Sequence, residues 1–119
     1  METKVYSESF VHASDLDWEN AGDGVRRKIL GSAREIMMVR VEFRKGAVGY
    51  LHKHPHRQVT YVDSGRFEVE ISGKIERLSA GDSLIVGPDV QHGVRALEDG
   101  CLMDVFTPAR EDFLKGSNK

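Results

Sequence analysis

Residues 46–65 have the sequence GAVGYLHKHPHRQVTYVDSG, in which a His-x-His pair and a glutamine stand between two bounding glycines. His52, His54 and Gln58 share one parity, and side chains two residues apart on an extended strand project from the same side. Two neutral imidazoles placed in this way lie near enough to share one transition-metal ion. A His-x-His pair also arises by chance, but four of the five histidines lie between positions 52 and 92. This clustering favours a metal site.

Outward from this stretch, the apolar residues follow a period of two. From Ile36 onward they take one parity, which is typical of a half-buried strand: Met37, Val39, Val41 and Phe43. The same pattern recurs in four more stretches: Val59-Tyr61, Phe67-Val69-Ile71, Leu84-Val86 and Leu102-Asp104-Phe106. Turn-forming residues separate them: Asp63-Ser64-Gly65, Ser72-Gly73-Lys74, Ala80-Gly81-Asp82, Gly87-Pro88-Asp89 and Glu98-Asp99-Gly100. Short strands at this spacing, without long helical stretches, predict an all-β antiparallel sandwich or barrel.

The two ends of the chain have a different pattern. Residues 12–28 offer Ser14 as a helix N-cap and then a glycine-rich loop, or alternatively an irregular lead-in that packs Trp18 on the sandwich. Near the other end, Pro108 stands at the expected first position of a short helix with acidic residues in its first turn. We expect residues 116–119 to form a frayed tail.

Composition limits the class of protein. The 119 residues, 39% hydrophobic and 30% charged, predict one globular domain over residues 1–119. A domain of this size folds without disulfides or a structural metal, so a bound metal is free to serve function. The 17 Lys and Arg against 19 Asp and Glu give a net charge of −2, without the basic excess of a nucleic-acid binder.

The location of the protein is also predicted from the sequence. The single Cys101 makes no intramolecular disulfide, and residues 1–10 lack the basic start and apolar core of a signal peptide. The longest aliphatic runs, 36–39 and 84–86, fall far short of the roughly 20 residues that span a bilayer. We therefore expect a cytoplasmic protein without a membrane segment.

Two stretches resemble the motifs of the cupin family. The spacing of glycine, histidine and glutamine in residues 46–65 resembles the first cupin motif, and residues 81–92, from Gly81-Asp82 through Pro88 to His92, resemble the second. The resemblance implies a single cupin domain, a double-stranded β-helix (jelly-roll) barrel with short helical end segments. It also implies one divalent metal ion bound by four residues: His52, His54, Gln58 and His92. Two departures are Gln58, where many cupins carry Glu, and the pair Gly87 and Asp89, where Pro and Gly are usual.

The predicted ligand set is electrically neutral, because Gln58 supplies an amide oxygen in place of a carboxylate. A divalent ion there keeps its full charge and acts as a stronger Lewis acid. Zn, Ni, Mn and Fe all fit such a donor set. The alternative is that these histidines are ordinary hydrogen-bonded residues and Gln58 a surface amide. His56 shares their parity, but Pro55 disturbs the strand beside it, so we expect His56 at the rim or behind the ligands.

Longer stretches resemble the KdgF-type pectin-degradation cupins. They comprise residues 24–30, 37–41, 52–62 and 97–113 and together span most of the chain. Gln at the Glu position is usual in that family. The resemblance implies linearisation (ring opening) of 4,5-unsaturated monouronates from pectin or alginate breakdown to 5-keto-4-deoxyuronate, hence an enzyme with a small uronate substrate. The alternatives are a non-catalytic cupin that binds a small sugar acid or metal, and a cupin dioxygenase.

Three further residues are candidates for catalysis. Asp104 shares a face with Leu102 and Phe106, and an acid inside an apolar barrel needs a partner or a function. One interpretation pairs Asp104 with Arg40 or Arg110 and leaves Phe106 in the core. The family's Asp-x-Phe-x3-Arg pattern implies instead that Asp104 is a general acid/base, that Phe106 shapes the sugar pocket and that Arg110 binds the uronate carboxylate through a bidentate fork.

The remaining predictions concern surfaces. Residues 26–28, Arg-Arg-Lys, are typical of a solvated edge. Edge strands of small jelly rolls are commonly covered by a partner, which predicts a homodimer.

Overall fold

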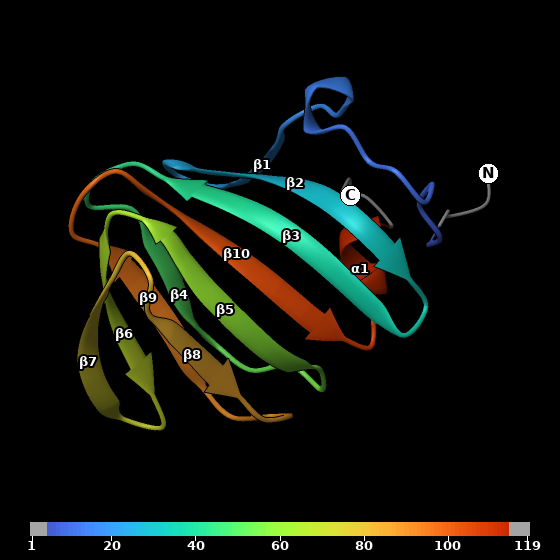
Figure 1. The fold of residues 1–119 in the computed structure, drawn as a ribbon. Coiled ribbons are helices and arrows are strands. Elements are labelled where there is room, and N and C mark those ends of the chain that lie inside the picture. The colour runs from blue at the N-terminus through green and yellow to red at the C-terminus, as the bar shows by residue number, and fades with distance from the viewer. Residues whose placement is uncertain (1–4, 115–119) are drawn as a thin grey trace.

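Two antiparallel sheets pack face to face in the computed structural model, which describes residues 5–114 (Figure 1). The six-stranded sheet contains, in spatial order, β1 (Glu19–Gly22), β2 (Val25–Ala33), β3 (Ile36–Phe43), β10 (Gly100–Thr107), β5 (Arg57–Ser64) and β8 (Ser83–Val86). The four-stranded sheet contains β4 (Val48–His52), β9 (His92–Ala96), β6 (Arg66–Ile71) and β7 (Lys74–Ser79). This arrangement confirms the predicted all-β jelly roll.

The hydrophobic core lies between the sheets. On β3 the predicted alternation is confirmed, since Met37, Val39 and Phe43 are buried. The larger cluster joins both sheets and contains Val25, Phe43, Ala47, Val62, Phe67, Val69, Leu84, Val86, Ala96 and Leu102. The smaller one contains Val5, Met37, Val39, Phe106 and Ala109. Phe106 therefore belongs to the core as well as to the site described below.

Strand β5 faces the opposite way from its apolar pattern. Val59 and Tyr61, the residues that carried the alternation, point outward and are 43% and 48% exposed. Gln58 and Thr60 are buried instead, with exposures of 8% and 1%. The prediction from the Val59-Tyr61 pattern was therefore wrong. The physical reason is that the inner face of β5 provides polar groups to an internal site, and so the apolar side chains lie on the outer face.

The N-terminal segment contains a hairpin that the sequence analysis missed. A short 3-10 helix η1 (Ala13–Asp15) includes Ser14 within it, and no side chain caps it, so the prediction of Ser14 as N-cap was wrong. Strand β1 then pairs with β2, where a loop was expected. Trp18 lies against β2, with the Arg26 guanidinium 3.9 Å from its ring centre. The expected packing of Trp18 on the sandwich is confirmed.

The C-terminal helix α1 (Glu111–Leu114) begins later than Pro108. Ala109 is buried and its N–H donates to the carbonyl of Arg34, so the chain stays along the sheet until Arg110. The expected tail at 116–119 lies outside the described residues. In the described range, no helix has the length and hydropathy needed to cross a membrane.

Candidate metal centre and adjoining pocket

The four predicted ligands converge between the two sheets. His52 is the last residue of β4 and His92 the first of β9, and the two are register partners. His54 lies in the connection that follows β4, and Gln58 is the second residue of β5. No regular strand runs from His52 to Gln58, because the chain leaves the four-stranded sheet after His52 and joins the other sheet at Arg57. Their convergence comes from this crossing rather than from one strand face.

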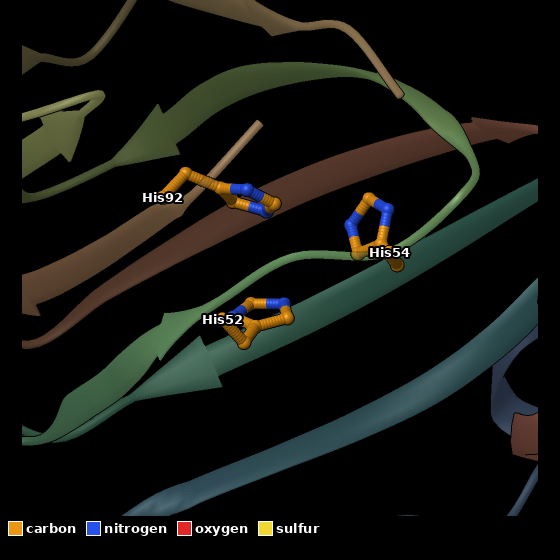
Figure 2. Close-up of side chains that lie close together, drawn as sticks. All are labelled: His52, His54 and His92. Atoms are coloured by element: carbon orange, nitrogen blue, oxygen red, sulfur yellow. The ribbon is translucent and has the colours of Figure 1, made fainter. Parts of the chain in front are cut away.

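The three imidazoles point toward a common space (Figure 2). One ring nitrogen from each lies within 4.8 Å of the others. The ring centres of His52 and His92 are 4.5 Å apart, and those of His54 and His92 are 4.8 Å apart. His54 and His92 are buried, whereas His52 is exposed at the opening.

Backbone carbonyls fix the orientation of each ring. The Nδ1 atoms of His52, His54 and His92 donate to the carbonyls of Tyr50 at 2.9 Å, His56 at 3.1 Å and Val90 at 2.8 Å, respectively. A carbonyl only accepts, so Nδ1 carries the proton and Nε2 presents a lone pair to the common space. This is the arrangement in which metal-binding histidines are usually held.

The donor set fits a cation. The Nε2 atom of His92 is buried and has no hydrogen-bond partner in the described part of the chain. The Nε2 atom of His54 lies 3.0 Å from Oε1 of Gln58, and with Nδ1 protonated both atoms are acceptors. Buried acceptors that face one another without a donor are costly unless a positive charge satisfies them. These four side chains are therefore suited to hold a divalent metal ion.

Two backbone positions bring the motifs together at this centre. A Cβ on Gly93 would lie 2.8 Å from the carbonyl oxygen of Gly49, so glycine there lets β9 approach β4 closely beside His92. Asp89 has a φ of 61°, a left-handed conformation that Asp tolerates better than most residues, and its N–H donates to the carbonyl of His54 at 2.7 Å. This conformation explains why glycine is usual at the position of Asp89.

A cavity of about 260 Å³ adjoins the three histidines' common space and extends between the sheets. Its volume suits a ligand smaller than a drug-sized molecule. Its lining includes several residues named above and some that the sequence analysis did not select: Arg27, Tyr50, His52, Gln58, Thr60, His92, Asp104, Phe106, Arg110 and Phe113. The predicted residues Asp104, Phe106 and Arg110 thus all lie at the same cavity as three of the predicted metal ligands, His52, Gln58 and His92.

The pairing of β10 with β5 places Asp104 next to the predicted ligands. Asp104 of β10 lies opposite Thr60 of β5, and the Thr60 hydroxyl donates to Asp104 Oδ1 at 2.6 Å. Burial raises the pKa of Asp104 to about 6, although the Thr60 hydrogen bond and the Arg110 charge oppose the shift. The alternative of an ion pair between Asp104 and Arg40 or Arg110 is not found among the described residues. Burial also lowers the pKa of His54 and of His92, which favours the neutral imidazole that a metal needs.

Arg110 lies beside Phe106, but one edge of its guanidinium is already bound. Its Nε and Nη2 atoms donate to the Asp112 carboxylate at 3.0 and 2.8 Å, and this lowers the pKa of Asp112. Guanidinium carries five N–H donors, so its Nη1–Nη2 edge is still free to bind a second carboxylate through the expected bidentate fork. Its side chain is only 12% exposed and lines the cavity.

An arginine-aromatic stack closes one side of the cavity. The Phe113 ring lies between two guanidinium groups, with the Arg27 carbon 3.7 Å and the Arg110 carbon 4.1 Å from its centre. Arg27 also pairs with Glu19 at 3.1 Å. The prediction of a solvated edge was wrong for Arg27, because β2 turns this side chain inward while Arg26 stays outside. Sequence analysis missed Arg27, Phe113 and Thr60.

His56 lies close to this site without joining the three-histidine cluster. Its ring is 5.4 Å from that of His54 and 6.3 Å from that of Phe106, between centres. Its backbone carbonyl, rather than its imidazole, orients His54. This position agrees with the expected place behind the ligands.

Known proteins resemble this chain in fold and in sequence. The cupin domain family matches residues 39–106, which include both motifs. The pectin degradation protein KdgF of Dickeya dadantii (strain 3937) is 48% identical over 102 residues, or 84% of this chain and 93% of that protein. The crystal structure of an RmlC-like cupin from Shewanella frigidimarina superposes with a TM-score of 0.90 at 45% identity, covering 92% of this chain and 99% of that one. The structure of KdgF from Halomonas sp. superposes with a TM-score of 0.86 at 41% identity, covering 91% and 100%.

Proposed function

The chain belongs to the KdgF family of cupins, and on that premise we propose that it opens the ring of 4,5-unsaturated monouronates released from pectin or alginate, giving 5-keto-4-deoxyuronates. The observation that carries the proposal is the position of Asp104. A desolvated carboxylate lies two hydrogen bonds from a neutral, inward-facing donor set, in a cavity that also contains an arginine. A binding protein would not need a proton-transfer group there.

The reaction is an isomerisation that consumes no water. The C1 hydroxyl of the cyclic hemiacetal loses its proton, C1 becomes an aldehyde, and the bond between C1 and the ring oxygen breaks. The electron pair goes to the ring oxygen, which leaves an enolate across C4 and C5. A proton added at C4 then gives the 5-ketone. One group that accepts a proton at the first step and returns it at the second is enough.

In our proposal Asp104 moves the proton. Its carboxylate accepts the C1 hydroxyl proton and donates a proton to C4. Arg110 binds the C6 carboxylate through its free edge, and Phe106 packs against the sugar ring. His52, His54, Gln58 and His92 would hold one divalent ion, with Zn, Ni, Mn and Fe as candidates. When bound, the ion supplies Lewis acidity toward the substrate carboxylate and the developing enolate charge.

An absorbance time course tests this function. Purified protein is mixed with lyase-generated 4,5-unsaturated monouronate, and the absorbance of the conjugated double bond is followed with and without chelator. We expect loss faster than in buffer, and chelation should abolish the acceleration. Oxygen consumption would favour a dioxygenase, and an unaccelerated reaction with every metal would favour a non-catalytic binding protein.

Substitution of Arg110 by Lys should weaken substrate binding. Lysine keeps the charge but loses the planar fork and the contact with Phe113, so we expect KM for the uronate to rise about 10- to 100-fold with a smaller change in kcat. The matched control is Arg34→Lys, because Arg34 is 64% exposed and its one ion pair within residues 5–114 is with Glu111. Steady-state kinetics of both variants decide this, and an unchanged KM in Arg110→Lys would remove Arg110 from the binding site.

We also propose that the chain forms a homodimer through the outer face of the six-stranded sheet. Met38, Val105, Val59 and Ile85 are successive register neighbours across four strands, and Ile85 is 61% exposed. These side chains form an apolar row across the centre of the outer face, and contiguous exposed apolar surface on a folded domain marks an interaction site. Arg57 and Asp63 stand at opposite ends of β5, so a twofold axis that crosses β5 at right angles near its centre places opposite charges together.

Light scattering after size exclusion tests the homodimer. Wild-type protein should elute as a dimer, whereas Val59→Lys should elute as a monomer at the same concentration, since two uncompensated lysines would be buried near the axis. Ile75→Lys is the control, because Ile75 is 56% exposed on the other sheet. A monomeric wild-type protein would overturn the proposal.

A further inference from the structure

Thr60 is the buried link between the ligand set and Asp104. Its side chain is only 1% exposed, and its hydroxyl lies between the amide of Gln58 and the carboxylate of Asp104. Gln58 and Thr60 are adjacent inward-facing residues of β5, and β10 places Asp104 directly across from Thr60. These contacts are fixed by strand geometry rather than by a flexible loop.

The hydrogen bonds along this link have one consistent direction. The Asp104 carboxylate accepts the single hydroxyl hydrogen of Thr60 at 2.6 Å. The hydroxyl oxygen is therefore free to accept from Nε2 of Gln58, which lies 2.8 Å away. The same nitrogen lies 3.5 Å from Asp104 Oδ1, so both contacts direct the amide NH2 group away from the histidines. As a result, Oε1 of Gln58 faces His54.

We propose that Thr60 is a positioning residue that holds the Gln58 amide with its oxygen toward the metal centre and holds Asp104 at the cavity wall. Without the hydroxyl, the amide keeps only the long 3.5 Å contact with Asp104 as an acceptor for its NH2 group. It can then rotate and present a nitrogen, which is no ligand, to the histidines. The effect on metal affinity depends only on the geometry described, whereas the effect on catalysis rests on the proposed function.

The same link explains why position 58 holds an amide. A carboxylate at position 58 would place two acidic groups around the Thr60 hydroxyl, which has one hydrogen to donate. One of the two carboxylates would then face a lone pair of the Thr60 oxygen. It would also lie close to the other, like-charged carboxylate, and this is unfavourable in a buried site. Gln58 and Asp104 are thus a matched pair, and the departure from the usual Glu follows from the presence of Asp104.

Metal affinity is the first test. Zn2+ affinity is measured by competition with a chromophoric chelator for wild-type protein, Thr60→Val, Thr60→Ser and the control Thr107→Val, a matched substitution at an exposed threonine of β10. We expect Thr60→Val to bind Zn2+ about 10- to 100-fold more weakly, the usual effect of losing a group that orients a ligand. Thr60→Ser and Thr107→Val should stay within about threefold of wild type. If Thr60→Val does not fold, Thr60→Ala serves for the same comparison with the same expected direction.

Kinetics give the second test. At saturating metal, Thr60→Val should lower kcat for ring opening at least about 10-fold with little change in KM, and Thr60→Ser should restore it. Wild-type Zn2+ affinity in both Thr60→Val and Thr60→Ala would overturn the proposal. A wild-type protein without ring-opening activity would refute the proposed function but leave the affinity test of Thr60 intact.

Discussion

Replacement of Asp104 by Asn is expected to lower kcat for ring opening by about 10²- to 10⁴-fold, the usual contribution of a general acid/base. Asn has almost the same shape and keeps an oxygen that accepts from Thr60, so the structure should be preserved. It cannot take a proton from the C1 hydroxyl or return one to C4. Zn2+ affinity should change little, because Asp104 is not a member of the ligand set. Steady-state kinetics and chelator competition on the same preparation check both expectations.

Asp17→Asn is the matched control for Asp104→Asn. Asp17 is an exposed aspartate between η1 and β1, away from the cavity lining and from the proposed dimer face. We expect this control to keep wild-type kcat. If Asp104→Asn also turned over at the wild-type rate, the proton would have to be carried by another group, and Asp104 would be left without the proposed role.

Replacement of His92 by Leu should remove tight metal binding and reduce ring opening to the rate in buffer. His92 Nε2 is the buried atom that faces the common space without a hydrogen-bond partner among the described residues. Its loss leaves two imidazoles and an amide oxygen, so we expect Zn2+ affinity to fall at least about 100-fold. Without metal the variant should be nearly as stable as wild type, because only the Nδ1 hydrogen bond to Val90, worth about 1 kcal/mol, is lost.

Thermal unfolding with and without Zn2+ checks this expectation. A metal that binds only the folded state raises its stability by roughly 2.7 kcal/mol at a hundredfold excess over Kd. Wild type and the control His12→Leu, at an exposed histidine beside η1, should show the rise in Tm, and His92→Leu should not. An equal rise in all three would place the metal elsewhere.

The convergence of the four candidate ligands was predictable from the sequence because its signal is local and chemical. Spacing gave His52, His54, Gln58 and His92, and the comparisons confirm the family to which this spacing belongs. The strand assignment around them was less successful. On β5 the apolar pattern of Val59 and Tyr61 predicted the wrong inner face. The rule that apolar side chains face inward is reversed here, because β5 lines a polar cavity on its inner face and has an exposed apolar outer face.

Three pocket residues could not be predicted, since their role depends on register and distant packing. Thr60 lies next to Asp104 only because β5 pairs with β10 in a particular alignment. Arg27 and Phe113 meet because the β1–β2 hairpin and α1 end at the same side of the cavity, and neither element has a strong sequence signal. For Gln58 an indirect signal existed, since an amide at a position usually held by Glu suggests a second acid nearby.

The neutral ligand set and the single nearby acid suit the proposed chemistry. Four uncharged donors leave a bound divalent ion its full charge for an anionic substrate, and Arg110 adds a second positive group. Asp104 is the acidic side chain of the cavity lining. Proton transfer is thus assigned to Asp104, and charge neutralisation to the bound ion and Arg110.

Proton NMR follows the proposed ring opening itself. The vinyl proton at C4 of a 4,5-unsaturated monouronate is followed together with the signals of the open-chain 5-ketone, with metal-loaded protein, chelated protein and buffer alone. We expect metal-loaded protein to convert the first set of signals into the second much faster than buffer does, and chelated protein to give no such acceleration. Equal rates in all three samples would contradict this expectation, and the site would then be one that binds a metal or a sugar acid without opening the ring.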